Sequence, residues 1–409
     1  MPEARRFLLS CFACDPGAGS EPYVGWHWAY TVYAGERRVV LTRSHHRAAL
    51  AGREGAGLSF RYFDLPFLAG LDHRHRLMKP YYMLWQLCVL PYALWIALRE
   101  RITDIHHVTY NAVDFPGLLW LIPFARFRWG PVGGGQTAPP ALRRYYGAAW
   151  GRERRRAAMK ALLRFNPLAR GALLRSALTL AANGETRARL APLSPRPVER
   201  LLETAAERVA EHPRRPHDPL RVIWVGRFEP RKAPLLLVEI AAALATSHPG
   251  RFAFTMVGGG PLLASIRAAA PANVEIRGEL PFAAMRAAYA AADVLAFTSL
   301  QDTSGNVVLE ALSAGMPVVA LDHQGSAEIL PAGGGLLVPV GPAEAVIAGF
   351  AAALARLLDA GVYAGVARAG LLNAARNHLW EARARSFRAI EAAAAAPGAT
   401  IPTGARDSA

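Results

Sequence analysis

The sequence predicts an α/β protein built from two Rossmann-like, doubly wound domains that face each other across a cleft. Short apolar runs alternate with helical stretches along the chain, a pattern typical of parallel sheets. The runs fall into two sets of about six, and each set begins with a strand followed by a turn. A chain of 409 residues, of which 52% are hydrophobic, is long enough for two or three domains with ample cores.

The first half contains six predicted strands. They are Phe7–Cys11, Arg38–Thr42, Leu58–Phe63, Ile105–Thr109, Arg126–Trp129 and Ala177–Ala181. Between the third and the fourth lies Tyr81–Leu98, an uncharged segment whose length reaches the lower limit for crossing a bilayer. Three interpretations stay open for it: a core helix, a helix lying in a membrane interface, and a membrane span that would split the sheet.

Three prolines in Ala210–Pro219 predict a linker between the two domains. Six strands are predicted beyond it, at Arg221–Val225, Phe252–Val257, Val274–Arg277, Val294–Thr298, Val318–Leu321 and Gly335–Val338. We therefore expect a first domain over residues 1–210 and a second over residues 211–376. The amphipathic stretch Leu379–Ile390 predicts a last helix over residues 377–396, followed by a disordered tail over residues 397–409.

The net charge of +16 is unevenly distributed along the chain. Basic residues crowd one region of the first half, at Arg143, Arg144, Arg152, Arg154, Arg155, Arg156, Lys160, Arg164, Arg170 and Arg175. Such a region is either a solvated face or a surface that attracts anionic lipid or phosphorylated substrates. Nucleic acid is not expected as a partner, because the aromatic residues are not interleaved with basic ones.

The three cysteines do not suggest a disulfide framework. Cys11 and Cys14 have the spacing of a redox or zinc pair, but no second pair completes a metal site, so buried thiols are the favoured interpretation. No signal peptide is visible. We expect a cytoplasmic protein, with peripheral attachment to the inner face of the cell membrane as a further possibility.

The stretch from Gln301 to Ala320 carries the strongest functional signal. Asp302 and Glu310 are separated by seven residues and straddle the start of a predicted short helix. A helix start offers free N–H groups and a positive dipole to an anion, while carboxylates accept hydrogen bonds from hydroxyls. Phosphate-binding backbone beside hydroxyl-binding acids suits a nucleotide sugar.

Two further motifs precede this stretch. Val225–Lys232 follows a strand end and carries three cations, Arg227, Arg231 and Lys232, and Met256–Pro261 leads from a strand into three glycines. Together the three motifs resemble those of retaining glycosyltransferases of family 4, which have the two-domain GT-B fold, and they cover residues 221–330. The family usually has Glu, followed by Gly-Phe-Gly, at the first acid. Asp302 is one methylene shorter and is followed by Thr-Ser-Gly.

The resemblance implies roles for four charged side chains. Arg227 and Lys232 would hold the diphosphate and stabilise the negative charge that grows on it as the glycosidic bond breaks. Glu310 would bind the ribose hydroxyls, and Asp302 would contact the donor sugar. The metal-binding Asp-x-Asp pair of other transferases is missing from the sequence, so fixed cations are expected in place of a metal, with no cofactor.

The resemblance also implies positions where backbone atoms or turns approach the ligands. N–H groups of Ser304, Gly305 and Asn306, in the turn after Asp302, would bind sugar hydroxyls and phosphate. The glycine turn at Gly259 would admit ligand, and the next turn, at Arg277, would lie beside the base. The first Gly-rich loop would approach the diphosphate and acceptor at Gly19, with Glu21 expected to face the acceptor.

The acceptor side is less defined by the sequence. His106 and His107 end a predicted strand, so either His107 faces the cleft as a catalytic group or these histidines are buried and satisfied. Many family members carry a histidine at a later strand end. The stretch here, Trp129–Gln136, has none, and its residues Gly133–Gly135 could instead admit the donor sugar or the acceptor.

The predicted function is therefore metal-independent transfer of a sugar, with retention, from a nucleoside-diphosphate sugar to a hydroxyl of a saccharide or lipid-linked acceptor. The expected setting is bacterial exopolysaccharide, lipopolysaccharide or glycolipid synthesis. One alternative is a catalytically impaired relative that only binds nucleotide sugars, as the change to Asp302 suggests. A dinucleotide-dependent oxidoreductase would need a clean GxGxxG followed by an acid about 20 residues later, which neither half supplies.

Overall fold

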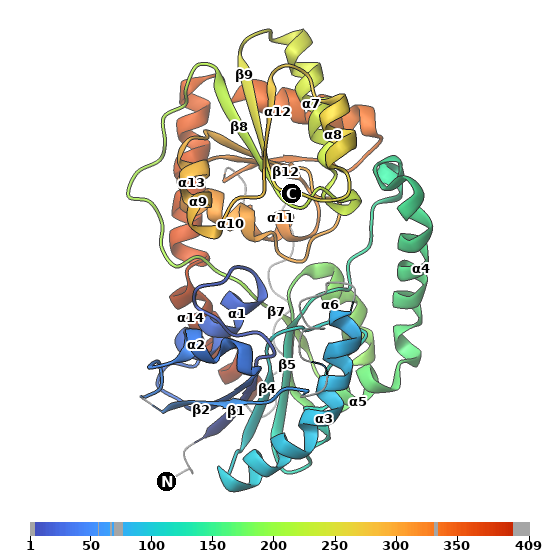
Figure 1. Ribbon diagram of the computed structural model, residues 1–409, viewed down its shortest axis with the longest axis vertical. Coiled ribbons are helices and arrows are strands. Elements are labelled where there is room, and N and C mark those ends of the chain that lie inside the picture. Colours follow the sequence, from blue (N-terminus) through green and yellow to red (C-terminus); the bar gives the residue numbers. More distant parts are fainter. Residues whose placement is uncertain (1–4, 56, 66–67, 69–76, 331–333, 396–409) are drawn as a thin grey trace.

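The protein consists of two α/β lobes stacked along its long axis (Figure 1). This computed structural model describes residues 5–395 except residues 56, 66–67, 69–76 and 331–333. The first sheet has the strand order β3-β2-β1-β4-β5-β6-β7 and the second the order β10-β9-β8-β11-β12-β13, and all pairs are parallel. Each order runs outward from the first strand of its lobe and then reverses, which confirms the predicted pair of doubly wound domains.

The first sheet contains the six predicted strands and one more. Its strands are β1 (Arg6–Ser10), β2 (Arg37–Thr42), β3 (Leu58–Tyr62), β4 (Asp104–His107), β5 (Arg126–Val132), β6 (Ser176–Ala181) and β7 (Val198–Arg200). The helices of this half of the chain are α1 (Glu21–His27), η1 (Trp28–Val32), η2 (Ser44–His46), α2 (Arg47–Leu50), α3 (Met78–Arg99), η4 (Leu119–Leu121), η5 (Pro140–Ala149), α4 (Trp150–Ala161), η6 (Leu162–Phe165), α5 (Pro167–Arg175), α6 (Gly184–Leu190) and η7 (Ala191–Leu193).

The second sheet contains all six strands that were predicted for it. They are β8 (Leu220–Val225), β9 (Phe252–Val257), β10 (Val274–Gly278), β11 (Val294–Phe297), β12 (Val318–Leu321) and β13 (Leu336–Val338). The helices of this half of the chain are η8 (Pro230–Lys232), α7 (Pro234–Ser247), α8 (Leu263–Ala269), α9 (Phe282–Ala290), α10 (Asn306–Ser313), α11 (Gln324–Ile329), α12 (Ala343–Arg356), α13 (Ala360–Asn377) and α14 (Trp380–Ala395). Strands β11 and β12 are buried at every residue, because helices cover both faces of this sheet.

Two segments, η5 and α14, cross from one lobe to pack on the other. In η5, Leu142, Tyr145 and Tyr146 are buried in the core of the second lobe. Arg144 holds the same segment there through ion pairs with Glu239 and with Glu344. In the opposite direction, α14 packs on η1 and β6 of the first lobe.

The uncharged segment Tyr81–Leu98 lies within α3, a helix of 22 residues. Among the described residues it is the single helix long and apolar enough to cross a membrane. One stripe of it, which includes Trp85 and Val89 with no exposed surface, packs on the first sheet beside Ile105. The helix is therefore part of this lobe, as the core-helix interpretation requires, although its other stripe is exposed.

The three cysteines are free thiols. Cys11 and Cys14 are buried at the end of β1, and burial raises the pKa of both thiols above its ordinary value. This confirms the interpretation of that pair as buried thiols. Cys88 lies on the exposed stripe of α3.

Candidate functional site

The loop between β11 and α10, residues 298–305, lies at the carboxyl edge of the second sheet, where open α/β sheets bind their ligands. Gly305 has a φ of +75° and precedes the first residue of α10, and no side chain caps the start of this helix. A Cβ at Gly305 would lie 3.2 Å from the ring of Phe297, so both the backbone angle and the space favour glycine. The helix start is therefore left open toward an anion.

Glu310 lies one turn into α10 and is exposed. The Tyr289 hydroxyl donates a 2.6 Å hydrogen bond to its Oε2. Desolvation by neighbouring protein atoms raises the pKa of the Glu310 carboxyl, although water still reaches the residue. Tyr289 thus orients a carboxylate that keeps further acceptor capacity for ligand hydroxyls.

Lys232 and Asp302 come together at this edge. The Lys232 ammonium forms an ion pair with the Asp302 carboxylate, and 16% of the lysine and 19% of the aspartate side chain are exposed. Arg227 follows β8 on the adjacent loop, is 52% exposed, and has its Nε 4.0 Å from a carboxylate oxygen of Glu229. Two cations and one acid of the sequence motifs therefore lie on loops that surround the start of α10.

The glycine turn after β9 supports the loop that carries Arg227. A Cβ at Gly258 would lie 1.9 Å from the Gly226 carbonyl oxygen, and the φ of Gly258 is +142°. The Phe228 N–H donates a 2.8 Å hydrogen bond to the Gly259 carbonyl. The two backbones can pack this closely because the glycines have no side chains.

At Gly259 itself, an added Cβ would lie 2.8 Å from the Glu279 carboxylate. The structure thus shows protein atoms of the neighbouring turn at the position where the sequence suggested a ligand. Arg277 lies on the edge strand β10, 42% exposed, and pairs with Glu275 of the same strand through a 2.9 Å contact.

On the first lobe, the loop after β1 carries Gly19, which is half-buried. The Asp15 carboxylate accepts a 2.8 Å hydrogen bond from the Gly17 N–H and so shapes this loop. Glu21 begins α1, accepts a 3.1 Å hydrogen bond from the Tyr110 N–H, and has its pKa raised by burial. Glu21 therefore connects the β1 loop to the loop that follows β4.

The expectation that His107 faces the cleft is wrong. Its side chain is fully buried, with Nε2 2.8 Å from the Tyr82 hydroxyl and Nδ1 3.2 Å from Ser10 Oγ. Burial lowers its pKa to about 3, so it stays neutral at physiological pH. His106 is buried as well, between Tyr33 and a backbone carbonyl. The physical reason is that β4 is a central strand with both faces covered.

The glycines after β5 were expected to admit the donor sugar or the acceptor, but protein atoms lie close to two of them. A Cβ at Gly133 would lie 2.7 Å from Cγ2 of Thr303, and a Cβ at Gly135 would lie 2.6 Å from Cα of Thr186. Gln136 donates a 2.8 Å hydrogen bond to the Thr303 hydroxyl. Gly133 therefore admits the β11–α10 loop of the second lobe, and Gly135 admits the start of α6 in its own lobe, so protein atoms lie at these points of closest approach.

Glu203 is a site residue that sequence reasoning missed. Ser304 donates a 2.6 Å hydrogen bond to its Oε1, whereas its Oε2 is buried with no hydrogen-bond partner among the described residues. Burial, with a smaller contribution from the negative charges of Glu21 and Asp302, raises the pKa of Glu203 to about 7. It lies in irregular chain after β7, so no local pattern marks it, and the fold alone brings it to Ser304.

Further contacts hold the lobes together at this edge. Asn183 donates to the Thr303 carbonyl at 3.0 Å, and Gln324 donates to Glu185 at 3.2 Å. No group of three or more His, Cys, Asp or Glu side chains that could hold a metal ion is found in the described part of the chain.

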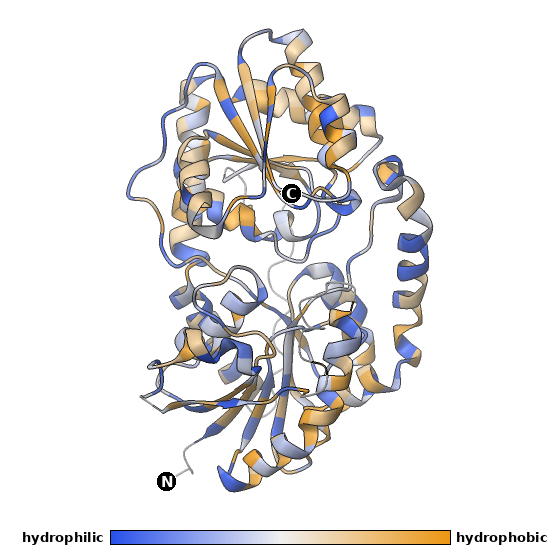
Figure 2. Cartoon of the chain, in the orientation of Figure 1, coloured by the Kyte–Doolittle hydropathy of each residue, from blue (hydrophilic) through white to orange (hydrophobic). Residues whose placement is uncertain are grey.

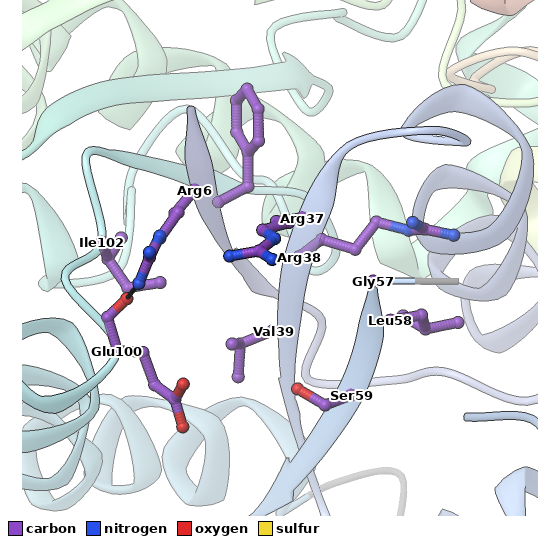
Figure 3. Close-up of a pocket in the computed structure, with 10 residues that line it drawn as sticks. Arg6, Arg37, Arg38, Val39, Gly57, Leu58, Ser59, Glu100 and Ile102 are labelled. Carbon is purple, nitrogen blue, oxygen red and sulfur yellow. Dashed lines mark hydrogen bonds between the residues drawn. The ribbon is translucent and has the colours of Figure 1, made fainter. Parts of the chain in front are cut away.

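A shallow pocket elsewhere does not belong to this site. It has a volume of about 280 Å³ and lies where β1, β2 and β3 begin, at the opposite edge of the first sheet (Figure 3). Two of its basic side chains bond to the backbone, since Arg6 donates to the Glu100 carbonyl at 3.1 Å and Arg38 to the Ala29 carbonyl at 2.6 Å. The pocket is thus separate from the carboxyl edges where the two lobes meet.

Comparison with known proteins finds a family match in the second lobe. Residues 219–360 match the family described as "Glycosyl transferases group 1". The chain is 35% identical over 136 residues to a D-inositol 3-phosphate glycosyltransferase of Nocardia farcinica, covering 30% of each chain. It is 32% identical over 148 residues to a GDP-mannose-dependent alpha-mannosyltransferase of Mycobacterium tuberculosis, covering 36% of this chain and 37% of that protein. The matches span about a third of these relatives' length.

Solved structures agree with the fold over nearly the whole chain. HepE from Anabaena, in complex with UDP and glucose, superposes with a TM-score of 0.61 and 15% identity, covering 95% of this chain and 99% of that one. WaaG, a glycosyltransferase involved in lipopolysaccharide biosynthesis, superposes with a TM-score of 0.58 and 15% identity, covering 94% and 99%. The two lobes therefore have the GT-B arrangement, and the match to the group 1 family lies in the second.

Proposed function

We propose that this protein transfers a sugar from a nucleoside-diphosphate sugar to a hydroxyl of a saccharide or lipid-linked acceptor, because residues 219–360 match the family described as "Glycosyl transferases group 1". The observation that carries the proposal is the meeting of Lys232 with Asp302 beside the uncapped start of α10. A phosphate can bind there to the helix start and the lysine, while the acid accepts hydrogen bonds from sugar hydroxyls.

In this proposal the diphosphate lies at the start of α10. N–H groups around Ser304–Asn306 and the charges of Arg227 and Lys232 stabilise the negative charge that grows on the leaving group. When Lys232 turns toward the diphosphate, the Asp302 carboxylate becomes available to the hydroxyls of the donor sugar. Glu310, already oriented by Tyr289, binds the ribose hydroxyls.

We further propose that transfer occurs with retention, through an oxocarbenium-like state. The bond between the sugar and the diphosphate oxygen breaks, and the acceptor oxygen forms a new bond on the same face of the ring. The acceptor proton passes to the departing phosphate. His107 takes no part in this step, because it is buried and bonded on both ring nitrogens.

The same cations are proposed to make the reaction independent of metal. Arg227 and Lys232 supply the positive charge that a divalent ion supplies on the diphosphate of other transferases. Three free thiols, one of them exposed at Cys88, suit a reducing cytoplasm, where we place the protein. Support for a nucleotide-sugar donor comes from the UDP and glucose bound in HepE and from the GDP-mannose in the name of the mycobacterial relative.

A panel of nucleotide sugars that includes UDP-glucose and GDP-mannose tests the donor. At about 100 times its dissociation constant, the true donor should stabilise the folded protein by about 2.7 kcal/mol, which a thermal shift detects. Release of nucleoside diphosphate in the presence of acceptor and excess chelator then tests transfer. Failure of every donor to bind would refute the proposal, and activity restored only by magnesium or manganese would refute metal independence.

Binding without transfer would identify the second candidate, an impaired nucleotide-sugar-binding relative. The shorter acid at position 302, held by Lys232, is the observation that favours it. Asp302→Glu separates the two candidates, because restoring the family's usual acid should create activity in an impaired relative and should merely be tolerated by an active enzyme.

A further inference from the structure

Exposed apolar side chains gather on one side of the first lobe. Among the described residues, fifteen large apolar side chains are exposed, and thirteen of them lie between residues 77 and 174. They are Leu77, Met83, Leu84, Leu87, Leu94, Trp95, Leu98, Leu121, Phe124, Met159, Leu162, Phe165 and Leu174. Figure 2 shows apolar colour along α3 and α5, on the outer side of that lobe. Exposed apolar surface concentrated in this way usually marks an interaction site.

Helix α3 contributes most of this surface. It is apolar all round, a composition typical of helices covered on every side, yet only one stripe of it is buried in the lobe. Leu84, Leu87, Trp95 and Leu98 recur at helical spacing on the opposite stripe, where Leu87 is 59% and Leu98 61% exposed. The fold itself leaves this stripe without a partner among the described residues.

The other elements extend the same surface. Element η4 contacts both α3 and α5, and η6 joins α4 to α5. Trp120 of η4 packs directly on α5, since a Cβ at Gly171 would lie 2.4 Å from its ring. We call the outer surface of α3, η4, α4, η6 and α5 the apolar-basic face.

The charge of this face is predominantly positive, although the partly exposed Asp114 pairs with Lys79 of α3. Residues 140–176 contain ten Arg or Lys residues and one acid, Glu153, which is buried and bonded to Arg156 at 2.5 Å. Helix α3 contains Lys79 and Arg99 and no acid. The exposed basic side chains of α4, η6 and α5 are Arg152, Arg154, Arg155, Arg156, Arg164, Arg170 and Arg175.

We propose that the apolar-basic face docks on a bilayer that contains anionic lipids. The exposed stripe of α3 and the exposed ring of Phe165 enter the boundary between headgroups and acyl chains, while the arginines bind lipid phosphates. A second copy of the chain would instead bring two sets of like charges together, which is unfavourable. The proposal goes beyond the donor chemistry and does not depend on it.

Docking there would also place the bilayer beside the site. Helix α4 runs along one side of both lobes, from η5 at the second lobe down to η6 (Figure 1). Lys160, near the end of α4, donates to the Gln136 carbonyl in the loop that touches Thr303. A lipid-linked acceptor would therefore be presented on the lobe that borders the donor loop.

Sedimentation with sucrose-loaded vesicles tests the electrostatic part. We expect binding to 3:1 POPC:POPG vesicles at 50 mM NaCl, weaker binding to POPC alone, and release at 500 mM NaCl, because salt screens exposed charges. The triple change Arg152→Ser, Arg154→Ser and Arg155→Ser should lower the partition coefficient roughly 100-fold, at about fivefold per charge. The matched triple change on the second lobe, Arg267→Ser, Arg286→Ser and Arg356→Ser, should leave it unchanged.

The exposed thiol of Cys88 tests whether the outer stripe of α3 faces the bilayer. Cys88 lies on the outer stripe of α3 whereas Cys11 and Cys14 are buried, so a maleimide-polymer reagent should label the folded protein at Cys88, and Cys88→Ser should abolish labelling. Anionic vesicles should slow this labelling at least tenfold. The paired change Leu87→Gln and Trp95→Gln should weaken binding, whereas Leu372→Gln, on the second lobe, should not.

Equal binding of the two triple variants, or unchanged labelling of Cys88 on vesicles, would overturn the proposal. So would protection of Cys88 by rising protein concentration without lipid, which would identify a contact between two copies. None of these outcomes affects the donor-binding test, so the two proposals fail separately.

Discussion

The Lys232 ammonium is paired with Asp302 in the protein and with the diphosphate in the proposed reaction. Lys232→Ala and Arg227→Ala are each expected to lower kcat roughly 10²–10³-fold, by analogy with the loss of an oxyanion donor. Release of nucleoside diphosphate at saturating donor measures this. Arg267→Ala, an exposed cation on α8 of the same lobe, is the control and should retain full activity. Near-normal turnover in both site variants would remove these cations from the mechanism.

Glu310 is expected to act through charge. Glu310→Gln keeps its size and removes the charge, so nucleotide binding should weaken by about 1.5–3 kcal/mol, the range for hydrogen bonds to charged groups. Titration calorimetry with the nucleoside diphosphate measures the change. Tyr289→Phe leaves the carboxylate in place and removes the 2.6 Å bond that orients it, so a smaller loss is expected. Unchanged affinity in Glu310→Gln would make this residue structural.

Glu203 should make stability depend on pH. Its pKa is raised from 4.5 to about 7 in the folded protein, so folding favours the protonated form. Its contribution is fully present below about pH 4.5 and is lost as the pH rises through 7, a loss of up to about 3 kcal/mol. Glu203→Gln stays neutral, so it should gain stability relative to the wild type as the pH rises from 5 to 8. Parallel denaturation curves at all pH values would contradict this.

The sequence points to candidate site residues that lie in continuous motifs, since spacing and residue type are visible there. Arg227, Lys232, Asp302 and Glu310 are all found on loops or helix starts at one edge of the second sheet. His107 could not be placed, because its position at a strand end does not show which face of β4 is covered. Glu203 could not be found, because its contact with Ser304 joins residues 101 positions apart.

Among the structural elements, the central strands were the most predictable, because burial on both faces makes them apolar throughout. Strand β7 was missed since it has three residues, of which Glu199 and Arg200 are charged. The role of η5 was missed for another reason. Its buried residues Leu142, Tyr145 and Tyr146 cover the core of the lobe that follows in the chain, and a local pattern does not identify the surface that a helix covers.

The contact between the loops that follow β5 and β11, where Gly133 meets Thr303, can be tested by substitution. Gly133→Ala should push Thr303 aside, and a displacement of about 1 Å in a site can cost up to roughly 10²-fold in turnover. Thr303→Ser removes the methyl carbon that lies 2.7 Å from the added Cβ and keeps the hydroxyl bonded to Gln136. The double variant should therefore recover activity.

Steady-state kinetics on the two single variants and the double variant measure this coupling. Gly151→Ala is the matched control, because an added Cβ there meets no atom within 4 Å. If Gly133→Ala is as active as Gly151→Ala, the approach of the two loops does not matter for catalysis.

Across the whole molecule, each lobe completes the core of the other. Element η5 inserts Tyr145 and Tyr146 into the second lobe, while α14 returns Trp380 and Phe387 to the first. The two cores therefore exchange side chains although their sheets are separate. Relative movement of the lobes must bend the chain next to these anchors, since the anchors themselves are buried.

Phe387 provides the corresponding prediction. It is 1% exposed and lies with its ring 5.2 Å from that of Trp28 and 5.4 Å from that of Tyr33, so Phe387→Ala leaves a cavity in the first lobe. A loss of about 3–5 kcal/mol in the free energy of unfolding is expected. Leu372→Ala, which changes a residue that is 48% exposed on α13, should stay within about 0.5 kcal/mol of the wild type.

Hydrogen exchange locates this effect, because unfolding of two lobes need not be a single transition. In Phe387→Ala the amides of β1 and β4, which lie far from residue 387 in the chain, should exchange faster, while those of β11 and β12 change less. The reason is that Phe387 stacks on His106 of β4, at 5.8 Å between ring centroids, and belongs to the same core cluster as Phe7 of β1. Faster exchange confined to the second lobe would show that α14 stabilises the lobe it follows in sequence rather than the one it packs on.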